Sequence, residues 1–273
     1  MATPLTGLPP RCRVLYAART VIGRGWRYQL GGPFWRLYLN AAAGAEIVHP
    51  GGVHALTPGR IHVLPAWGEY ASRCHGEVGH VYLHVDPGEP LRDIARSPDP
   101  LARRFARPIA LPSDPAMEAR LGELADSPGR SPVWQLRAQA VALAALVACL
   151  DLLPAAERAR LDRDAVGDDA VAAAQIYIED FLHQELSIPR LARHCGLSPA
   201  HFGVRFKRRT GTAPQRYLRE RRIAVAAERL LAGPEPIDGI AAGCGFANRY
   251  HFSRVFAQLM GVGPAAYRRA GRF

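Results

Sequence analysis

The sequence predicts an α+β multidomain protein. A β-rich domain with added helices comes first, and an all-α domain built from two helix-turn-helix units follows. Three observations support this prediction. Short strand-like runs crowd residues 20–87, helical periodicity begins near residue 89, and the last third of the chain repeats itself. The 273 residues are enough for two domains. We place these domains at residues 1–153 and 170–273, with a linker at 154–169.

Several short strands are expected within residues 20–87. Runs of β-branched and aromatic residues alternate with turns rich in Gly and Pro, at roughly 8–12 residue intervals, which is typical of a small barrel or sandwich. Pro50, Gly51 and Gly52 separate two such runs, as in a hairpin. The expected strands lie at 34–39, 46–49, 53–56, 60–64, 70–74 and 80–85.

Helical spacing follows the strands. Apolar residues between 117 and 124 share one helical face, and a longer helix at 133–153 ends at Pro154. This longer helix is either a core helix or a dimer seam, and its apolar run at 141–150 is too short to span a bilayer. Residues 154–169 are charged and lack apolar periodicity, which favours a linker.

The C-terminal third contains the same unit twice, as expected for a duplicated supersecondary structure. Fifty residues apart, one set recurs: Phe202, Phe206, Gly211, Pro214 and Tyr217 as Phe252, Phe256, Gly261, Pro264 and Tyr267. Another recurs 49 residues apart: Ile188, Leu191, Ala192, Cys195 and Gly196 as Ile237, Ile240, Ala241, Cys244 and Gly245. Each copy reads as a helix, a glycine turn and a second helix, which is the pattern of a helix-turn-helix.

Each second helix has a predicted cap and an exposed face. Ser198 precedes one helix and Asn248 the other, and both residue types accept hydrogen bonds from a first helical turn. The phenylalanines face inward, so the opposite face can meet base edges in a DNA major groove. The exposed positions are Pro199, Ala200, Gly203, Val204 and Lys207, then Arg249, Tyr250, Ser253 and Arg254. A helix at 214–231 would hold both units at a fixed separation.

Basic residues are concentrated in the repeat. Residues 187–273 carry 16 Lys and Arg against four acidic residues, a net charge of +12, whereas residues 1–186 have a net charge of −1. A basic excess confined to one domain indicates a polyanionic partner, here double-stranded DNA. Flanking basic side chains are suited to phosphates, which position a protein without reading sequence. They are Lys207, Arg208, Arg209, Arg216, Arg219, Arg221, Arg222, Arg268 and Arg269.

Residues 170–273 resemble the DNA-binding domain of AraC/XylS-type bacterial transcription regulators. The matching motifs include Ile188-x-x-Leu191-Ala192, Ser198 to Lys207, Phe252-Ser253-Arg254-x-Phe256 and Gly261-x-x-Pro264-x-x-Tyr267-Arg268. The resemblance implies base-reading roles for Ala200, Gly203, Val204, Arg249, Tyr250, Ser253 and Arg254. The family usually has Arg where Val204 stands, so we expect the second unit to carry more of the base-specific readout.

The N-terminal half resembles the sensory domain of the same family, a cupin-like β-barrel followed by helices. The matching stretches are Phe34 to Tyr38, Gly51-Gly52, Pro58 to Arg60 and His80 to Val85. The resemblance implies a small-molecule effector inside the barrel and a homodimer. It favours an activator, which would also contact RNA polymerase. Candidate pocket residues, for each of which core packing is the alternative, are Trp35, Tyr38, Trp67, Tyr82 and His84.

The sequence leaves two alternatives to the interpretation as a regulator controlled by an effector. Six of the ten histidines lie between residues 49 and 84, and imidazole binds transition metals, so one alternative is a metal-dependent cupin enzyme fused to a DNA-binding domain. The sequence shows no carboxylate partner at suitable spacing and none of the common catalytic motifs. We therefore predict a non-enzyme without metal or cofactor. The other alternative is an effector-independent DNA binder.

The cysteines and the N-terminus favour a cytoplasmic location. The five cysteines are scattered and form no C-x-x-C pair, which fits reduced thiols better than disulfides or a zinc site. Residues 1–13 have no apolar segment, so we expect neither a signal peptide nor a membrane partner.

Overall fold

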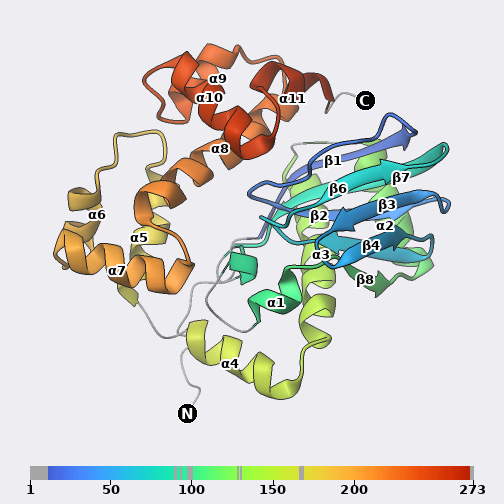
Figure 1. The fold of residues 1–273 in the computed structure, drawn as a ribbon, viewed down its shortest axis with the longest axis horizontal. Coiled ribbons are helices and arrows are strands. Elements are labelled where there is room, and N and C mark those ends of the chain that lie inside the picture. The colour runs from blue at the N-terminus through green and yellow to red at the C-terminus, as the bar shows by residue number, and fades with distance from the viewer. Residues whose placement is uncertain are drawn as a thin grey trace.

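A computed structural model describes residues 12–88, 91–92, 94–96, 101–127, 129, 131–165 and 169–270. It places a β-rich N-terminal half beside a helical C-terminal half (Figure 1). Helices α2 (Pro115–Asp126) and α3 (Pro132–Asp151) pack against the larger sheet, and two short turns, η1 (Ile94–Arg96) and α1 (Ala102–Phe105), precede them. The chain is thus a mixed α/β protein.

The named strands form two antiparallel sheets. Their orders are β1-β7-β2-β5-β8 and β4-β3-β6. Across the described ranges neither sheet closes on itself, so the cupin-like barrel expected for this half is not a closed one. The strands are β1 (Arg13–Ile22), β2 (Trp35–Asn40), β3 (Ala45–His49), β4 (Gly52–Leu56), β5 (Arg60–Leu64), β6 (Ala71–Cys74), β7 (Val78–Asp86) and β8 (Ile109–Pro112).

The two faces of β7 have different environments, because side chains alternate along a strand. Leu83 and Val85 are fully buried in the apolar core that includes the inner faces of α2 and α3. On the other face, the rings of His80 and Tyr82 lie 5.7 Å apart and those of Tyr82 and His84 lie 5.4 Å apart. These three side chains therefore share one face of the strand.

Helix α3 has one buried and one exposed apolar face. Ser131 caps its N-terminus, and the Ser131 hydroxyl accepts the N–H of Trp134 at 3.1 Å. Its inner residues, among them Ala138 and Val141, join the core. By length and composition the helix could cross a membrane, since its best window has a mean hydropathy of 1.6, although only 33% of that window is buried. A core helix of a water-soluble domain passes the same test, so this property alone does not place the helix in a bilayer.

The segment predicted as a linker contains a helix. Helix α4 (Ala155–Ala165) lies within 154–169, of which residues 166–168 fall outside the described part. Ala, Arg, Glu and Leu favour helices intrinsically, but the segment has no apolar stripe, so a search for periodicity overlooks it. Strand β8 and most of β1 lie outside residues 20–87, where strands were expected.

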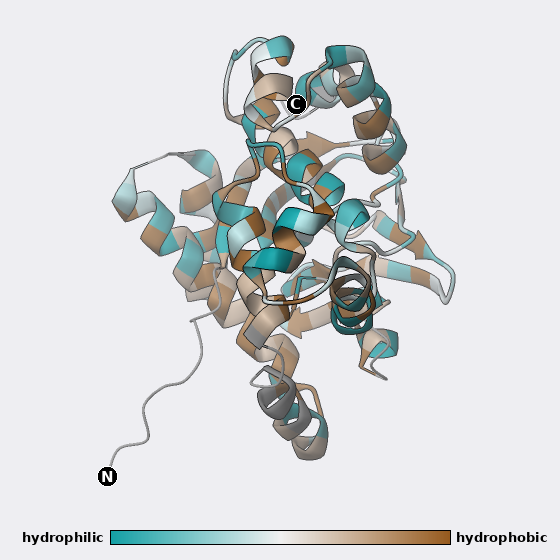
Figure 2. Ribbon diagram, turned by 90° about the vertical axis from the view of Figure 1, so that its left-hand side faces the viewer, coloured by the Kyte–Doolittle hydropathy of each residue, from teal (hydrophilic) through white to brown (hydrophobic). Residues whose placement is uncertain are grey.

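The C-terminal half packs around two pairs of phenylalanines. Phe202 and Phe206 lie among α5 (Asp169–Asp180), α6 (Ile188–His194) and α7 (Pro199–Thr210). Phe252 and Phe256 lie among α9 (Ile237–Gly243), α10 (Arg249–Met260) and α11 (Pro264–Ala270). Helix α8 (Pro214–Ala232) joins both clusters and runs between the two groups of helices (Figure 1). Figure 2 shows hydrophilic and hydrophobic residues alternating along these helices, as amphipathic packing requires.

Candidate functional site

The helix pairs α6–α7 and α9–α10 share one turn geometry. Gly196 and Gly245 both adopt left-handed backbone, with φ of +65° and +77°. After each glycine the next N–H bonds back to the first helix: Leu197 donates to the Ala192 carbonyl at 2.9 Å, and Phe246 donates to that of Ala241 at 3.0 Å. The repeat in the sequence is therefore also a repeat in hydrogen bonding.

Helices α7 and α10 begin and end in matching ways. The Ser198 hydroxyl accepts the N–H of His201 at 3.3 Å, and the side-chain amide oxygen of Asn248 accepts that of Tyr250 at 2.7 Å, so both predicted caps are confirmed. Each helix has 12 residues and ends at a left-handed glycine, Gly211 or Gly261. The two helices thus present equivalent first turns.

The predicted base-reading residues lie opposite the buried phenylalanines. On α7, Val204 is 66% exposed and Ala200 is exposed, whereas Gly203 is half-buried. On α10, Tyr250 is 83% exposed. The remaining predicted residues of α10 make few contacts. Arg249 pairs with Asp238 at 3.0 Å, and Arg254 lies 3.4 Å from the His251 ring nitrogen, while Ser253 is half-buried. Exposed ion pairs of this kind are weak, so DNA can displace them.

The predicted phosphate-binding residues fall into two groups. Lys207, Arg208 and Arg219 are exposed, Arg209 is half-buried, and Arg216 pairs with Glu220 while staying 62% exposed. Two others donate hydrogen bonds to backbone carbonyl oxygens. Arg222 donates to those of Leu182 and Gln184 at 3.0 and 2.6 Å, and Arg268 donates to that of Glu235 at 2.5 Å.

The prediction for Arg221 needs a correction. Its side chain is 2% exposed and ion-paired inside the protein, so the expectation that it contacts phosphate is wrong. Helix α8 is rich in arginines, and the sequence alone does not show which of them bind carboxylates inside the protein.

Comparisons with known proteins agree with the paired helices. A family model described as a helix-turn-helix domain matches residues 191–270. The multiple antibiotic resistance protein MarA of Salmonella typhimurium is 32% identical over 102 residues, which cover 37% of this chain and 80% of MarA. The chain belongs to the AraC family. It contains an AraC-type DNA-binding helix-turn-helix domain.

Further relatives of this AraC-family regulator differ in how much they share with it. The MmsAB operon regulatory protein of Pseudomonas aeruginosa is 34% identical over 96 residues, which cover 35% of this chain and 31% of that protein. The structure of ToxT from Vibrio cholerae O395 matches along most of the chain, with a TM-score of 0.60, 12% identity, and coverage of 93% of this chain and 96% of ToxT. At that identity the likeness is one of fold.

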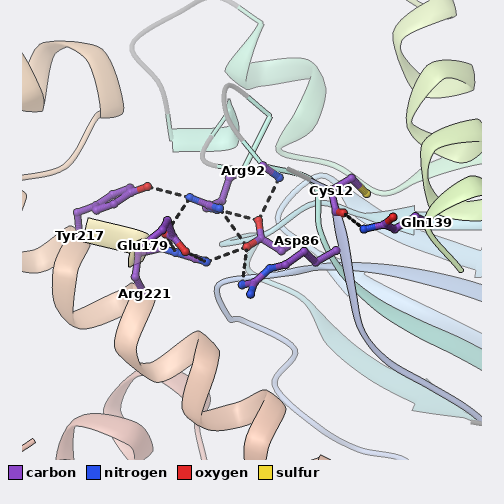
Figure 3. A network of polar contacts seen from close by, with 9 residues as sticks. Cys12, Asp86, Arg92, Gln139, Glu179, Tyr217 and Arg221 are labelled. Atoms are coloured by element: carbon purple, nitrogen blue, oxygen red, sulfur yellow. Dashed lines mark hydrogen bonds and ion pairs between the residues drawn. The ribbon is translucent and has the colours of Figure 1, made fainter. Parts of the chain in front are cut away.

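A buried ionic network joins the two halves of the AraC-family regulator (Figure 3). At the end of β7, Asp86 binds Arg92 at 2.7 and 3.0 Å and Arg221 of α8 at 2.8 Å. Arg221 also binds Glu179 of α5 at 2.5 Å, and Arg92 donates to the Tyr217 hydroxyl at 2.9 Å. Burial alone would raise the pKa of Asp86, but Arg221 and Arg92 hold it well below its usual range. The carboxylate is therefore ionised at neutral pH.

A second polar link and an apolar contact lie beside the network. Arg96 binds Glu220 of α8 at 2.7 and 2.9 Å, and its guanidinium lies 4.1 Å from the centre of the Trp67 ring. Phe34 of the N-terminal half packs in the same cluster as Phe256 and the rest of the α10 core. Helix α8 is thus tied to the N-terminal half by ionic contacts and by an apolar contact.

A cavity of about 830 Å³ lies between the sheet and the C-terminal helices of the AraC-family regulator. Of the five candidate pocket residues, Tyr38, Tyr82 and His84 line it. Trp35 and Trp67 do not: Trp35 is 1% exposed on the opposite face of β2, beside Phe105, and Trp67 lies against Arg96. Lining residues that the sequence prediction lacks include Trp26, Arg36, His80, Met260 and Tyr267.

The imidazoles of this region are uncharged at neutral pH. Burial lowers the pKa of His80 to about 3, with a smaller effect from His62. Burial, then Arg36 and His80, lower the pKa of His84 well below its usual value. No group of three His, Cys, Asp or Glu side chains placed to hold a metal occurs among the described residues.

Proposed function

We propose that this regulator binds specific DNA sites by placing the first turns of α7 and α10 in successive major grooves. The observation that carries the proposal is the matched geometry of the two helix pairs, with equivalent turns, caps and exposed faces. In this proposal residues 1–153 are the sensory domain, 154–169 the connecting segment and 170–273 the DNA-binding domain. Lys207, Arg208, Arg209 and Arg219 contact phosphates, and Arg222 and Arg268 do so only where their carbonyl contacts allow.

The cavity is the effector site in this proposal. It contacts β1, β2 and β7 on one side and α8, α10 and α11 on the other. A ligand there touches both halves, so its binding can shift a pre-existing equilibrium of interdomain arrangements. The regulator then acts in the cytoplasm as an activator that contacts RNA polymerase.

A homodimer completes the proposal, with α3 as the seam. Its outer face repeats apolar residues at alternating intervals of three and four, the spacing of a coiled-coil seam. Leu136 is 66% exposed and Val147 is 54% exposed. The seam residues are Val133, Leu136, Ala140, Leu143 and Val147.

A footprint of the full-length protein on promoter fragments from around its own gene tests the DNA-binding proposal. Two adjacent protected major grooves on one face of the duplex are expected, about one helical turn apart. Equal affinity for promoter and bulk competitor DNA at physiological salt would contradict sequence-specific binding.

A further inference from the structure

Two loops of the N-terminal half are joined to each other where they meet the C-terminal half. They are residues 31–34, just before β2, and residues 65–68, just after β5, and we call them the paired loops. The N–H of Trp67 in the second loop donates to the carbonyl oxygen of Gly32 in the first at 2.9 Å. The side chains that the two loops carry therefore keep fixed positions relative to each other.

The first loop places an aromatic ring in the core around α10. Phe34 is 1% exposed and packs in the same cluster as Phe252 and Phe256. From the N-terminal side, the His84 ring stacks on the Phe34 ring with 4.4 Å between their centres, and the Arg36 guanidinium lies 4.6 Å from the centre of the Phe34 ring. Because both halves pack against this ring, it fixes the α9–α10 pair relative to the first loop.

The second loop is linked to the end of α7. The Trp67 ring centre lies 4.1 Å from the guanidinium of Arg96. Arg96 donates to the Glu220 carboxylate at 2.7 and 2.9 Å and to the Thr212 hydroxyl at 3.1 Å. Thr212 directly follows Gly211, the residue at which α7 ends. One arginine thus connects the second loop to the α6–α7 pair.

Trp67 is held in a strained backbone conformation. Its φ is +64°, and within the described ranges no other residue except glycine has a positive φ. Left-handed backbone is unfavourable for a bulky residue and persists only where the surrounding structure enforces it. Strain of this kind is concentrated at positions that a function requires, which directs attention to the contact between Trp67 and Arg96.

The two helix pairs have almost no core in common. Phe202 and Phe206 lie in one apolar cluster, and Phe252 and Phe256 lie in another. Among the described residues, Val225 of α8 is the only apolar side chain that packs against both clusters. Helix α8 connects the pairs over 19 residues, and a helix of this length can bend. Helix α8 alone therefore leaves the angle between α7 and α10 adjustable.

We propose that the paired loops brace α7 against α10, so that the N-terminal half determines which spacing of DNA half-sites the protein accepts. Phe34 supports α10, and Trp67 supports α7 through Arg96. One base pair more or less between the sequences read by α7 and α10 displaces one groove by about 3.4 Å and rotates it by roughly a tenth of a turn, which a braced pair of helices cannot follow. The inference rests on the proposed binding in successive major grooves and adds the residues that set spacing specificity.

Distance measurements without DNA test the brace itself. Spin labels at Arg208→Cys on α7 and Gln258→Cys on α10, both exposed positions, report the distance between the helices by double electron–electron resonance on the full chain. The chain without these two substitutions is the labelling blank for its own five cysteines. Trp67→Ala should broaden the distance distribution. Trp134→Ala, which removes another half-buried tryptophan packed against the same N-terminal core, should not. A distribution in Trp67→Ala as narrow as that of the wild type would overturn the proposal.

Affinity for duplexes of altered spacing tests what the brace does. Fluorescence anisotropy of the full chain is measured on the footprinted site and on copies with one base pair added or removed between the half-sites. The wild type should lose at least about tenfold in affinity, a loss that a single wrong base pair can already cause. Trp67→Ala and Phe34→Leu should reduce this loss severalfold, whereas Phe105→Leu, at an equally buried position of the N-terminal core, should not. An unchanged loss in Trp67→Ala and Phe34→Leu would overturn the proposal.

Trp67→Phe tests the path through Arg96. It keeps an aromatic face for the guanidinium, so the distance distribution and the spacing penalty should remain close to those of the wild type. A relaxation as large as in Trp67→Ala would overturn the assigned contact.

The footprint separates this inference from the proposed function. A single protected groove would contradict binding by both helices, and the spacing role would fail with it. Two protected grooves together with an undiminished spacing penalty in Trp67→Ala would leave the proposed DNA binding intact and overturn the brace alone.

Discussion

Arg254 is the side chain of α10 best equipped to identify a base. It is exposed in the middle of the reading face, and its contact with His251, at 3.4 Å, is weak. Val204, its counterpart on α7, offers only apolar contact. In the proposed complex with DNA, the chemistry of these two residues makes α7 and α10 unequal readers.

Arg254→Ala should reduce discrimination between a specific and a scrambled DNA site by roughly 1–3 kcal/mol, because a bidentate arginine–guanine contact contributes that much. Val204→Ala should change it far less. Dissociation constants for both sites, measured by fluorescence anisotropy at one salt concentration, give the comparison. A larger loss in Val204→Ala would show that α7 is the principal reader.

Single residues were predictable where the interaction is local. The caps Ser198 and Asn248 bond to N–H groups within three residues of themselves, so the sequence contains the whole interaction. The partners of Arg221 could not be predicted in this way. Asp86 and Arg221 are 135 residues apart, and only the folded chain shows which arginines have carboxylates.

At the scale of elements, the first of the two repeated units allows a controlled test of backbone conformation. A Cβ added at Gly203 or at Gly196 would meet no atom within 4 Å. Gly203 lies within helix α7, whereas Gly196 has a φ of +65°. A difference between alanine variants therefore reports on the backbone alone.

Gly203→Ala should stabilise the protein by about 1 kcal/mol, because alanine is the better helix former. Gly196→Ala should destabilise it by roughly 1–2 kcal/mol, since left-handed backbone disfavours a Cβ. Urea unfolding of both variants measures the difference. A Gly196→Ala variant as stable as the wild type, or more stable, would mean that the turn of the first unit does not need glycine.

The exposed seam of α3 leads to a prediction about assembly. Leu136→Asp and Val147→Asp should each shift the protein towards monomer, because each removes about 1.5–3 kcal/mol of apolar burial from a dimer. Val53→Asp is the control, since Val53 is 54% exposed on β4, away from α3. Sedimentation velocity gives the oligomeric state. An unchanged dimer in both α3 variants would exclude the seam.

Elements were predictable in proportion to their periodicity. The amphipathic helices α7, α8 and α10 and the strands β2 to β7 match runs visible in the sequence. Helix α4 lacks an apolar stripe, and strand closure depends on pairing between distant segments. The helix and the open sheets therefore emerge only from the structure.

At the scale of the molecule, the buried ionic network sets how the DNA-binding half is held. Asp86 is its centre, with Arg92 and Arg221 as its close partners. Removing the carboxylate leaves both guanidinium groups with one partner fewer. Stability and interdomain arrangement should therefore change together.

Asp86→Asn should cost roughly 3–5 kcal/mol of unfolding free energy, as breaking a buried ion pair does. Asp126→Asn, which breaks the exposed pair with Arg19, should cost less than about 1 kcal/mol. Because the folded pKa of Asp86 is below its unfolded value, its stabilisation is present above about pH 4 and is lost as the pH falls further. The unfolding free energy, measured between pH 7 and pH 3, should therefore fall more steeply with decreasing pH for the wild type than for Asp86→Asn.

Strand β7 connects the cavity to α8 over a very short path. His84 lines the cavity, and Asp86, two residues further on and hence on the same side of the strand, binds Arg221. In the proposed function, a ligand that moves the backbone at His84 by a fraction of an ångström also moves the anchor of α8, the helix that connects the α6–α7 and α9–α10 pairs. A displacement caused by a small molecule can thus reach the DNA-binding helices along one face of a single strand, without a chain of intervening side chains.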